Sequence, residues 1–118
     1  MSDLIHAIQA MLVCALWSSI DFDGEPLDAA YGIEDFAEAT RLELEADLTA
    51  FMDAEAANLA ASGLNSEQIG HDFWLTTNGH GAGFWDRGLG EIGDRLTRAA
   101  KVYGGTDLYV GDDGKIYA

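Results

Sequence analysis

One segment determines how the chain folds: His71-Asp72-Phe73-Trp74-Leu75-Thr76-Thr77-Asn78-Gly79-His80-Gly81-Ala82-Gly83-Phe84-Trp85-Asp86-Arg87-Gly88. It runs from the end of one predicted helix to the start of the next. It combines two of the three histidines and two of the three tryptophans with four glycines. Bulky rings beside residues without side chains indicate a backbone bent tightly around a packed group. The packed group is either the protein's own core or a ligand.

A helix leads into this turn. Asn65 can cap its first turn while Gln68 reaches back to the cap, which is a variant of the capping box. Gly79 can end it in a left-handed conformation. The sequence therefore predicts a helix from Ser66 to Thr77 or Asn78, followed by a stretch without regular structure over residues 80–83.

Two helices are predicted upstream. Apolar residues at helical spacing indicate a helix from Asp3 to about Ser18. Residues 19–35 contain the only proline and form an acidic connecting loop. One long helix follows from Phe36 or Glu38 to Ser62, and Gly63 ends it. Its apolar stripe comprises Leu44, Leu48, Phe51, Met52, Ala56 and Leu59.

Downstream of the turn, a fourth helix is predicted from Gly88 to Tyr103. The short apolar runs 108–110 and 115–117 flank Gly111-Asp112-Asp113-Gly114, which predicts a hairpin. The predicted fold class is therefore α+β, mainly α, with about four helices and a small C-terminal antiparallel β-hairpin. Residues 1–118 are expected to form a single domain.

The charge of the chain is strongly negative. Its 118 residues include 21 acidic and six basic side chains, for a net charge of −15, whereas the 48% hydrophobic content is that of a folded protein. An acidic field repels nucleic acid and anionic membranes and attracts basic partners. We therefore expect no direct nucleic-acid or membrane binding. The alternative reading is that the acids serve solubility alone.

The single cysteine points to a reducing compartment. Cys14 lies in the apolar run 7–17 and has no second cysteine with which to form an intrachain disulfide. We expect it to act as a small buried hydrophobe. The same run lacks the preceding basic residues of a signal peptide and is too short to span a bilayer. The predicted location is the cytoplasm.

The segments HDFWLTTNGHGAGFWDRGLGEIGDRLTRAA and DLYVGDDGKIY, which begin at His71 and end at Tyr117, resemble a family of small proteins from tailed bacteriophages and prophages. The family has no assigned activity. Its pattern carries arginine where this chain has Thr77. The resemblance implies a phage or mobile-element protein that acts in the cytoplasm of a bacterial host.

Candidate catalytic residues cluster in the turn. Histidine titrates near neutral pH and serves as a base, a ligand or a switch, and neighbouring carboxylates or amides can orient it. The candidates are His71, Asn78, His80 and Asp86, with Asp72 as a further orienting group. In the structural alternative, Phe73, Trp74, Phe84 and Trp85 fill the core, while Asp86 pairs with Arg87 or Arg95 or caps the next helix. No spacing typical of a metal or phosphate site is present, so we predict no metal and no cofactor.

The acidic half offers a second candidate site. Residues 21–55 hold twelve acidic side chains and one basic side chain, Arg41. Carboxylates on a helix and its preceding loop can imitate a phosphate backbone and compete for a DNA-binding site. The predicted contact residues are Asp21, Asp23, Glu25, Asp28, Glu43 and Asp47, with the last two on the helix face opposite the apolar stripe.

Three functions follow from these patterns. The leading hypothesis is a non-enzymatic phage protein that binds a host protein and inhibits a nucleic-acid-binding defence factor, such as a restriction or CRISPR complex. The second is a small enzyme or ligand-binding protein with its site in the His71–Asp86 turn. The third is a structural or assembly protein whose aromatic turn is only core. The sequence leaves the oligomeric state open.

Overall fold

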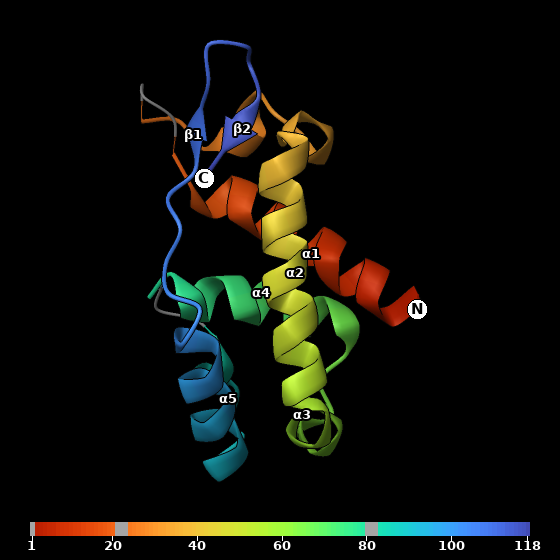
Figure 1. The fold of residues 1–118 in the computed structure, drawn as a ribbon. Coiled ribbons are helices and arrows are strands. Elements are labelled where there is room, and N and C mark those ends of the chain that lie inside the picture. The colour runs from red at the N-terminus through yellow and green to blue at the C-terminus, as the bar shows by residue number, and fades with distance from the viewer. Residues whose placement is uncertain (1, 21–23, 80–82) are drawn as a thin grey trace.

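The computed structural model describes residues 2–20, 24–79 and 83–118 (Figure 1). The predicted fold class is confirmed: the chain is mainly helical, with one small antiparallel sheet near the C-terminus. The α-helices of the described ranges are α1 (Ser2–Ser18), α2 (Glu38–Ala54), α3 (Ala56–Ser62), α4 (Ser66–Thr77) and α5 (Glu91–Lys101). The short 3-10 helices are η1 (Leu27–Ala29), η2 (Ile33–Asp35) and η3 (Phe84–Arg87), and the strands are β1 (Tyr109–Val110) and β2 (Ile116–Tyr117).

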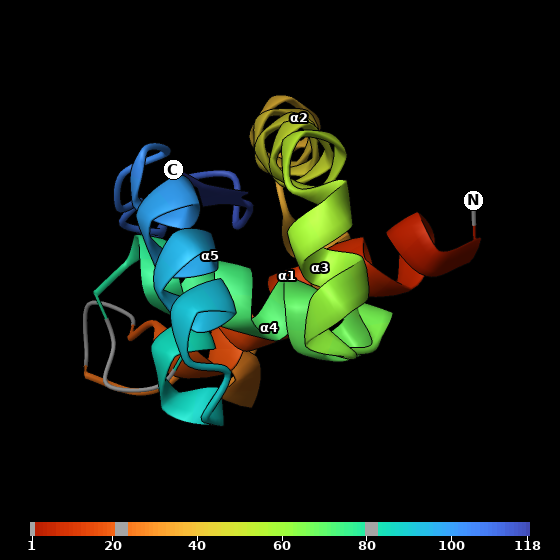
Figure 2. The ribbon, with the colours of Figure 1, turned by 90° about the horizontal axis from the view of Figure 1, so that it is seen from below.

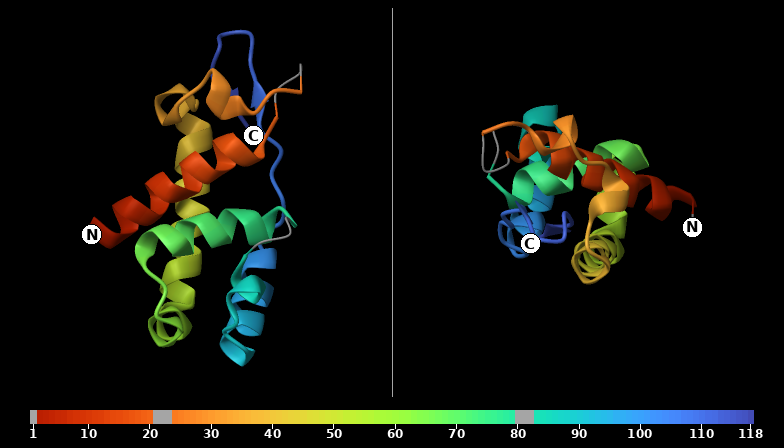
Figure 3. Two further views of the ribbon diagram at one scale, coloured as in Figure 1. Left: turned by 180° about the vertical axis from the view of Figure 1, so that it is seen from behind. Right: turned by 90° about the horizontal axis from the view of Figure 1, so that it is seen from above.

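The packing of α1 on α4 forms the centre of the molecule (Figure 3). Gly70 allows this close approach, because a Cβ atom at this position would overlap the backbone carbonyl oxygen of Ala7. At the C-terminal end of α1, the Trp74 side chain of α4 donates a hydrogen bond from its Nε1 to the Ser18 hydroxyl at 3.0 Å. The predicted capping box of Asn65 and Gln68 starts α4, and Gly79 follows it with a φ of +70°.

An aromatic cluster joins α2, α4 and the region around α5. The Phe51 ring lies 4.9 Å from the Phe73 ring and 5.6 Å from the Phe84 ring, between ring centres, and Tyr103 packs edge-on against both Phe51 and Phe73. The prediction that Trp85 fills the core is wrong, because its side chain is 40% exposed. Its ring instead lies beneath the Lys101 ammonium group, 6.0 Å from the ring centre.

The long helix predicted to end at Ser62 is two helices. The chain bends at Glu55, which ends α2 and begins α3 with φ −106° and ψ 19°. Figure 2 views α2 nearly end-on and shows α3 turned away from it. The bend brings α3 against α5 and buries Leu59, whereas a straight helix would continue along the α2 axis. Gly63 ends α3 in the left-handed conformation, as predicted.

The C-terminal hairpin packs beside the start of α2 (Figure 1). β1 and β2 pair antiparallel, with Val110 opposite Ile116. Ile116 also accepts a backbone hydrogen bond from Ala37 at 2.9 Å, which holds the hairpin against the main body. An isolated hairpin is marginally stable in water, so this contact and the burial of Ile116 explain why it forms.

Candidate functional site

The turn after α4 brings Arg87 back to Asp72. Phe84 donates its backbone N–H to the Thr76 hydroxyl at 3.3 Å, which closes the turn. Gly83 is required there, because a Cβ atom would collide with that hydroxyl and with the Trp85 ring. The chain therefore enters η3 close to α4 and places the Arg87 side chain beside the preceding helix.

A cluster of three charged or titratable groups results. Arg87 donates from Nε to Asp72 Oδ2 at 2.5 Å and from Nη2 to Asp72 Oδ1 at 3.0 Å. His71 Nδ1 lies 3.2 Å from Asp72 Oδ1. Asp72 is only 1% exposed, so its carboxylate depends on these partners. The hydrogen bonds to Asp72 raise the pKa of Arg87 above its ordinary value, which keeps the guanidinium charged.

The cluster fixes the orientation of the His71 ring. A carboxylate paired with arginine can only accept hydrogen bonds, so a bond from His71 to Asp72 requires the proton on Nδ1. In the neutral ring, Nε2 is then the free acceptor. The Trp17 ring packs on the other side, with its centre 5.6 Å from the His71 ring centre at an interplanar angle of 33°.

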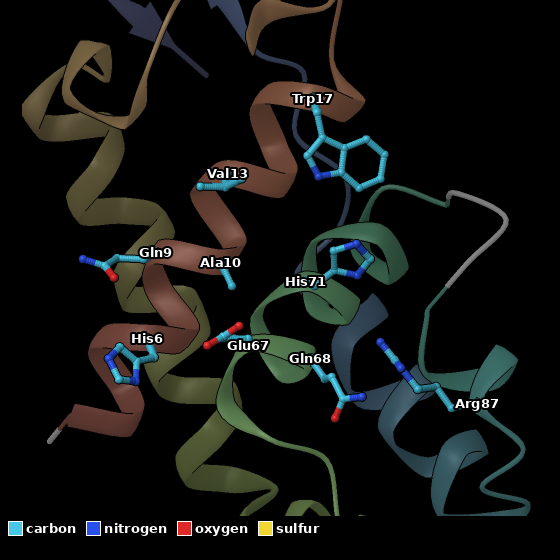
Figure 4. A pocket seen from close by; sticks show the side chains of 9 residues that line it. All are labelled: His6, Gln9, Ala10, Val13, Trp17, Glu67, Gln68, His71 and Arg87. Atoms are coloured by element: carbon cyan, nitrogen blue, oxygen red, sulfur yellow. The ribbon is translucent and has the colours of Figure 1, made fainter.

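A groove of about 480 Å³ runs between α1 and α4 beside this cluster (Figure 4). Figure 4 shows His6 near one end and Trp17, His71 and Arg87 near the other. The lining residues are His6, Gln9, Ala10, Val13, Trp17, Glu67, Gln68, His71 and Arg87. The predicted site residue His71 thus faces a groove whose other wall is α1.

A smaller hollow of about 320 Å³ brings Asp86 and His71 together, along with Asp72, Gly83 and Arg87. The expected pairing of Asp86 with Arg87 or Arg95 is not formed. Arg87 is held by the buried Asp72, and Arg95 pairs with Glu91 one turn away at 2.8 Å. Asp86 does not cap α5 either, because the residue that precedes this helix is Gly90.

Asn78 lies apart from this site and has a structural role. Its amide nitrogen donates to the Trp74 carbonyl at 3.0 Å, and its Oδ1 accepts the Thr106 backbone N–H at 2.8 Å. These bonds tie the segment after α5 to the end of α4. His80, the remaining candidate, lies outside the described residues.

The cluster offers hydrogen bonding at His71, and the neighbouring Cys14 adds no reactive group to it. Cys14 is fully buried, its Sγ lies 3.7 Å from the His71 carbonyl oxygen, and burial raises its pKa to about 12. It is therefore a packed thiol, not a nucleophile. Within residues 2–20, 24–79 and 83–118, no three His, Cys, Asp or Glu side chains gather as metal ligands.

Sequence reasoning missed the α1 wall of the groove. Val13 and Trp17 are one helical turn apart and lie off the apolar stripe that α1 buries. Two large apolar residues outside the stripe were the available signal. The Arg87–Asp72 pair had no such signal, because its partners are fifteen residues apart in the sequence, one on α4 and the other on η3.

The predicted acidic contacts are divided between two sides of the molecule. Asp28 is exposed on η1, which packs on α1 away from α2 (Figures 2 and 3). Glu25 lies two residues before η1, and Glu43 is exposed on α2. Asp21 and Asp23 lie outside the described residues. The contact set therefore does not form one continuous face across the residues that can be placed.

Asp47 does not lie on the outer face of the helix, where it was predicted. It is half-buried and lines a crevice with Leu44, Tyr103 and Thr106. Burial, and then the charge of Glu43 one turn away, raise its pKa above the ordinary 3.8. A raised pKa means that the folded state favours the protonated acid. This contribution to stability is present below pH 3.8 and is lost as the pH rises through the higher folded-state pKa.

We expect Asp47→Asn to stabilise the protein at pH 7 by a few tenths of a kcal/mol, because the substitution removes a charge that is disfavoured by burial and by Glu43 one turn away. The gain should shrink as the pH falls and Asp47 becomes protonated in the wild type. Urea unfolding at pH 7 and at lower pH measures both effects. Asp53→Asn, an exposed position on the same helix, is the control. An equal gain from both substitutions would show that burial at Asp47 is irrelevant.

Neither a protein-family model, a curated protein nor a solved structure matches this chain. Across the described part of the chain, none of the helices has the length and apolar character needed to cross a bilayer. The structure thus defines a mainly helical α+β protein with a half-buried histidine–aspartate–arginine cluster, an open groove beside it and an acidic helix on another side.

Proposed function

We propose that this is a non-enzymatic phage protein that binds a basic, nucleic-acid-binding host protein in the bacterial cytoplasm and blocks its access to DNA. One observation carries the proposal. The 17 residues of α2 hold five carboxylates and a single basic side chain, Arg41. Arg41 Nη1 lies 2.8 Å from Glu45 Oε2. The arginine therefore compensates the charge of Glu45 and reduces the repulsion among the other carboxylates only slightly.

The acidic helix has a suitable length and charge for such a role. The 17 residues of α2 span about 25 Å, over which one strand of DNA presents about seven phosphates. Five carboxylates lie on α2, and Glu38, Glu43 and Asp53 among them are exposed. A site that neutralises regularly spaced phosphates would be attracted by this charge. The phage setting is supported by the resemblance of residues 71–117.

The test is displacement of DNA. Labelled duplex is bound to purified host restriction and CRISPR effector complexes and then titrated with this protein. We expect the wild type to displace DNA from at least one complex. Glu38→Lys combined with Glu43→Lys should weaken displacement by about tenfold or more, since each reversal replaces an attractive charge with a repulsive one.

The matched control has the same change in net charge at another place. Asp107→Lys combined with Asp112→Lys reverses two exposed acids outside the acidic segment. This variant should displace DNA nearly as well as the wild type. Equal losses in both double variants would mean that only net charge matters. A wild type that displaces DNA from none of the complexes would refute the proposal.

A further inference from the structure

The α1 wall of the groove presents large apolar side chains that the fold does not bury. Val13 is 50% exposed and Trp17 is 44% exposed, and both line the groove with Ala10. The opposite side of α1 already packs through Met11, Cys14 and Ala15, which are fully buried. A half-exposed tryptophan at the mouth of a groove is a typical anchor point for a partner protein.

The side chains around the groove carry a net negative charge. Neither Ser2–Ser18 nor Ser66–Thr77, which form its two walls, contains a lysine or arginine. Arg87 lines it, but this guanidinium is bound to Asp72 through two hydrogen bonds. Glu67 lies on the α4 wall, and Asp86 lies in the adjoining hollow. The apolar α1 wall with acidic side chains near it is complementary to an apolar surface flanked by basic residues.

The dimensions favour a helix as the occupant. From His6 to Trp17 the α1 wall covers eleven residue steps, which is about 16 Å or three helical turns. A helix of that length presents apolar anchors at positions i, i+3, i+4 and i+7 along one face, the spacing used in helix-in-groove recognition. Lysine or arginine side chains at its other positions would be attracted by Glu67 and Asp86.

We infer that the groove between α1 and α4 docks an amphipathic, basic helix of the host partner. The inference rests on the proposed function. It adds to that function the surface that binds the partner, which is the groove, and the part of the partner that is bound, which is a helix. Trp17 anchors the apolar face of that helix, and the His71 Nε2 and Gln68 amide offer hydrogen bonds beside it. The Asp72–Arg87 pair holds His71 in place for this contact.

The experiment uses a labelled 14-residue synthetic helix of leucine and lysine as the probe and measures its affinity by fluorescence anisotropy. We expect Val13→Gln to weaken binding by about tenfold, in line with the loss of an interface anchor. Leu42→Gln is the control, because Leu42 is 51% exposed on α2 and so matches the exposure of Val13. This variant should bind as the wild type does.

A second peptide with the same residues in an order that destroys the apolar face separates docking from charge attraction. We expect it to bind at least tenfold more weakly than the ordered helix. In a Trp85→Phe background, binding of the ordered helix should also change the emission of Trp17, since Trp74 is buried. Equal binding of both peptides, or equal effects of Val13→Gln and Leu42→Gln, would overturn the inference.

The outcomes distinguish this inference from the proposed function. If the protein displaces DNA from a host complex but Val13→Gln has no effect on the probe helix, the groove inference is wrong and the proposed function stands. If the probe helix requires Val13 but no host complex loses its DNA, the groove is a docking site and the proposed function is wrong.

Discussion

Gly70→Ala should destabilise the protein by about 3 kcal/mol, at the upper end of the cost of overpacking a core. The added methyl group would overlap the carbonyl oxygen of Ala7, which belongs to the backbone of α1. No side-chain rotation can relieve that contact, so the two central helices must separate. The higher helix propensity of alanine returns only about 1 kcal/mol. Chemical denaturation followed by circular dichroism measures the loss.

Gly93→Ala is the matched control for helix propensity. Its new Cβ atom would lie 3.1 Å from the Phe84 carbonyl oxygen, which is tight but within the reach of a small adjustment. We expect a smaller loss at Gly93 than at Gly70. Because α1 and α4 form both walls of the groove, Gly70→Ala should also impair binding of the probe helix. A Gly70→Ala protein as stable as the wild type would contradict the described crossing of the two helices.

Arg87→Met should have the second large effect, a loss of about 3 kcal/mol, near the low end for breaking a buried ion pair. The carboxylate of Asp72 is almost completely buried and would lose both hydrogen bonds from the guanidinium. The low end is appropriate because the Arg87 side chain is itself 30% exposed. Arg87→Lys keeps the charge but cannot form the bidentate hydrogen bonds, so its stability should fall between those of the wild type and Arg87→Met.

A double-mutant cycle separates the ion pair from other effects. In Asp72→Asn combined with Arg87→Met, the buried charge is gone, so the double variant should lose less stability than the sum of the two single variants. His71→Gln is the control, because this partly exposed ring touches the same carboxylate but carries less of its hydrogen bonding. Additive losses in the cycle would mean that Asp72 and Arg87 do not act as a pair.

The fold was largely predictable because its local signals are strong. Asn65 with Gln68, Gly63 and Gly79 mark helix ends through specific backbone geometry, and each behaves as expected. The bend at Glu55 was not predictable from the α2 sequence. It depends on where α5 lies and on the burial of Leu59, which are consequences of tertiary packing.

The candidate sites were less predictable for the same reason. Spacing along the chain placed His71 and Asp86 near each other, and they do share a hollow. It also grouped Asn78 with them, but α4 directs Asn78 toward Thr106. The groove depends on α1, which ends at Ser18, far from the start of α4 at Ser66 in the sequence. Which acids share a face likewise depends on the packing of η1 against α1.

The proposed function and the groove fit together in one physical account. Long-range attraction by the acidic helix would speed the encounter with a basic partner, and short-range packing at Trp17 would slow its release. These two contributions respond differently to salt, because screening weakens exposed charges and leaves apolar packing in place.

The most direct test of the central claim is therefore the DNA-displacement titration repeated over a series of salt concentrations. We predict that the affinity of the wild type for the host complex, calculated from the displacement curve and the DNA affinity measured at the same salt concentration, falls steadily as salt rises. Glu38→Lys combined with Glu43→Lys should both lower this affinity at low salt and flatten its salt dependence. Displacement that is independent of salt, or equally salt-dependent in the double variant, would contradict binding through the acidic surface.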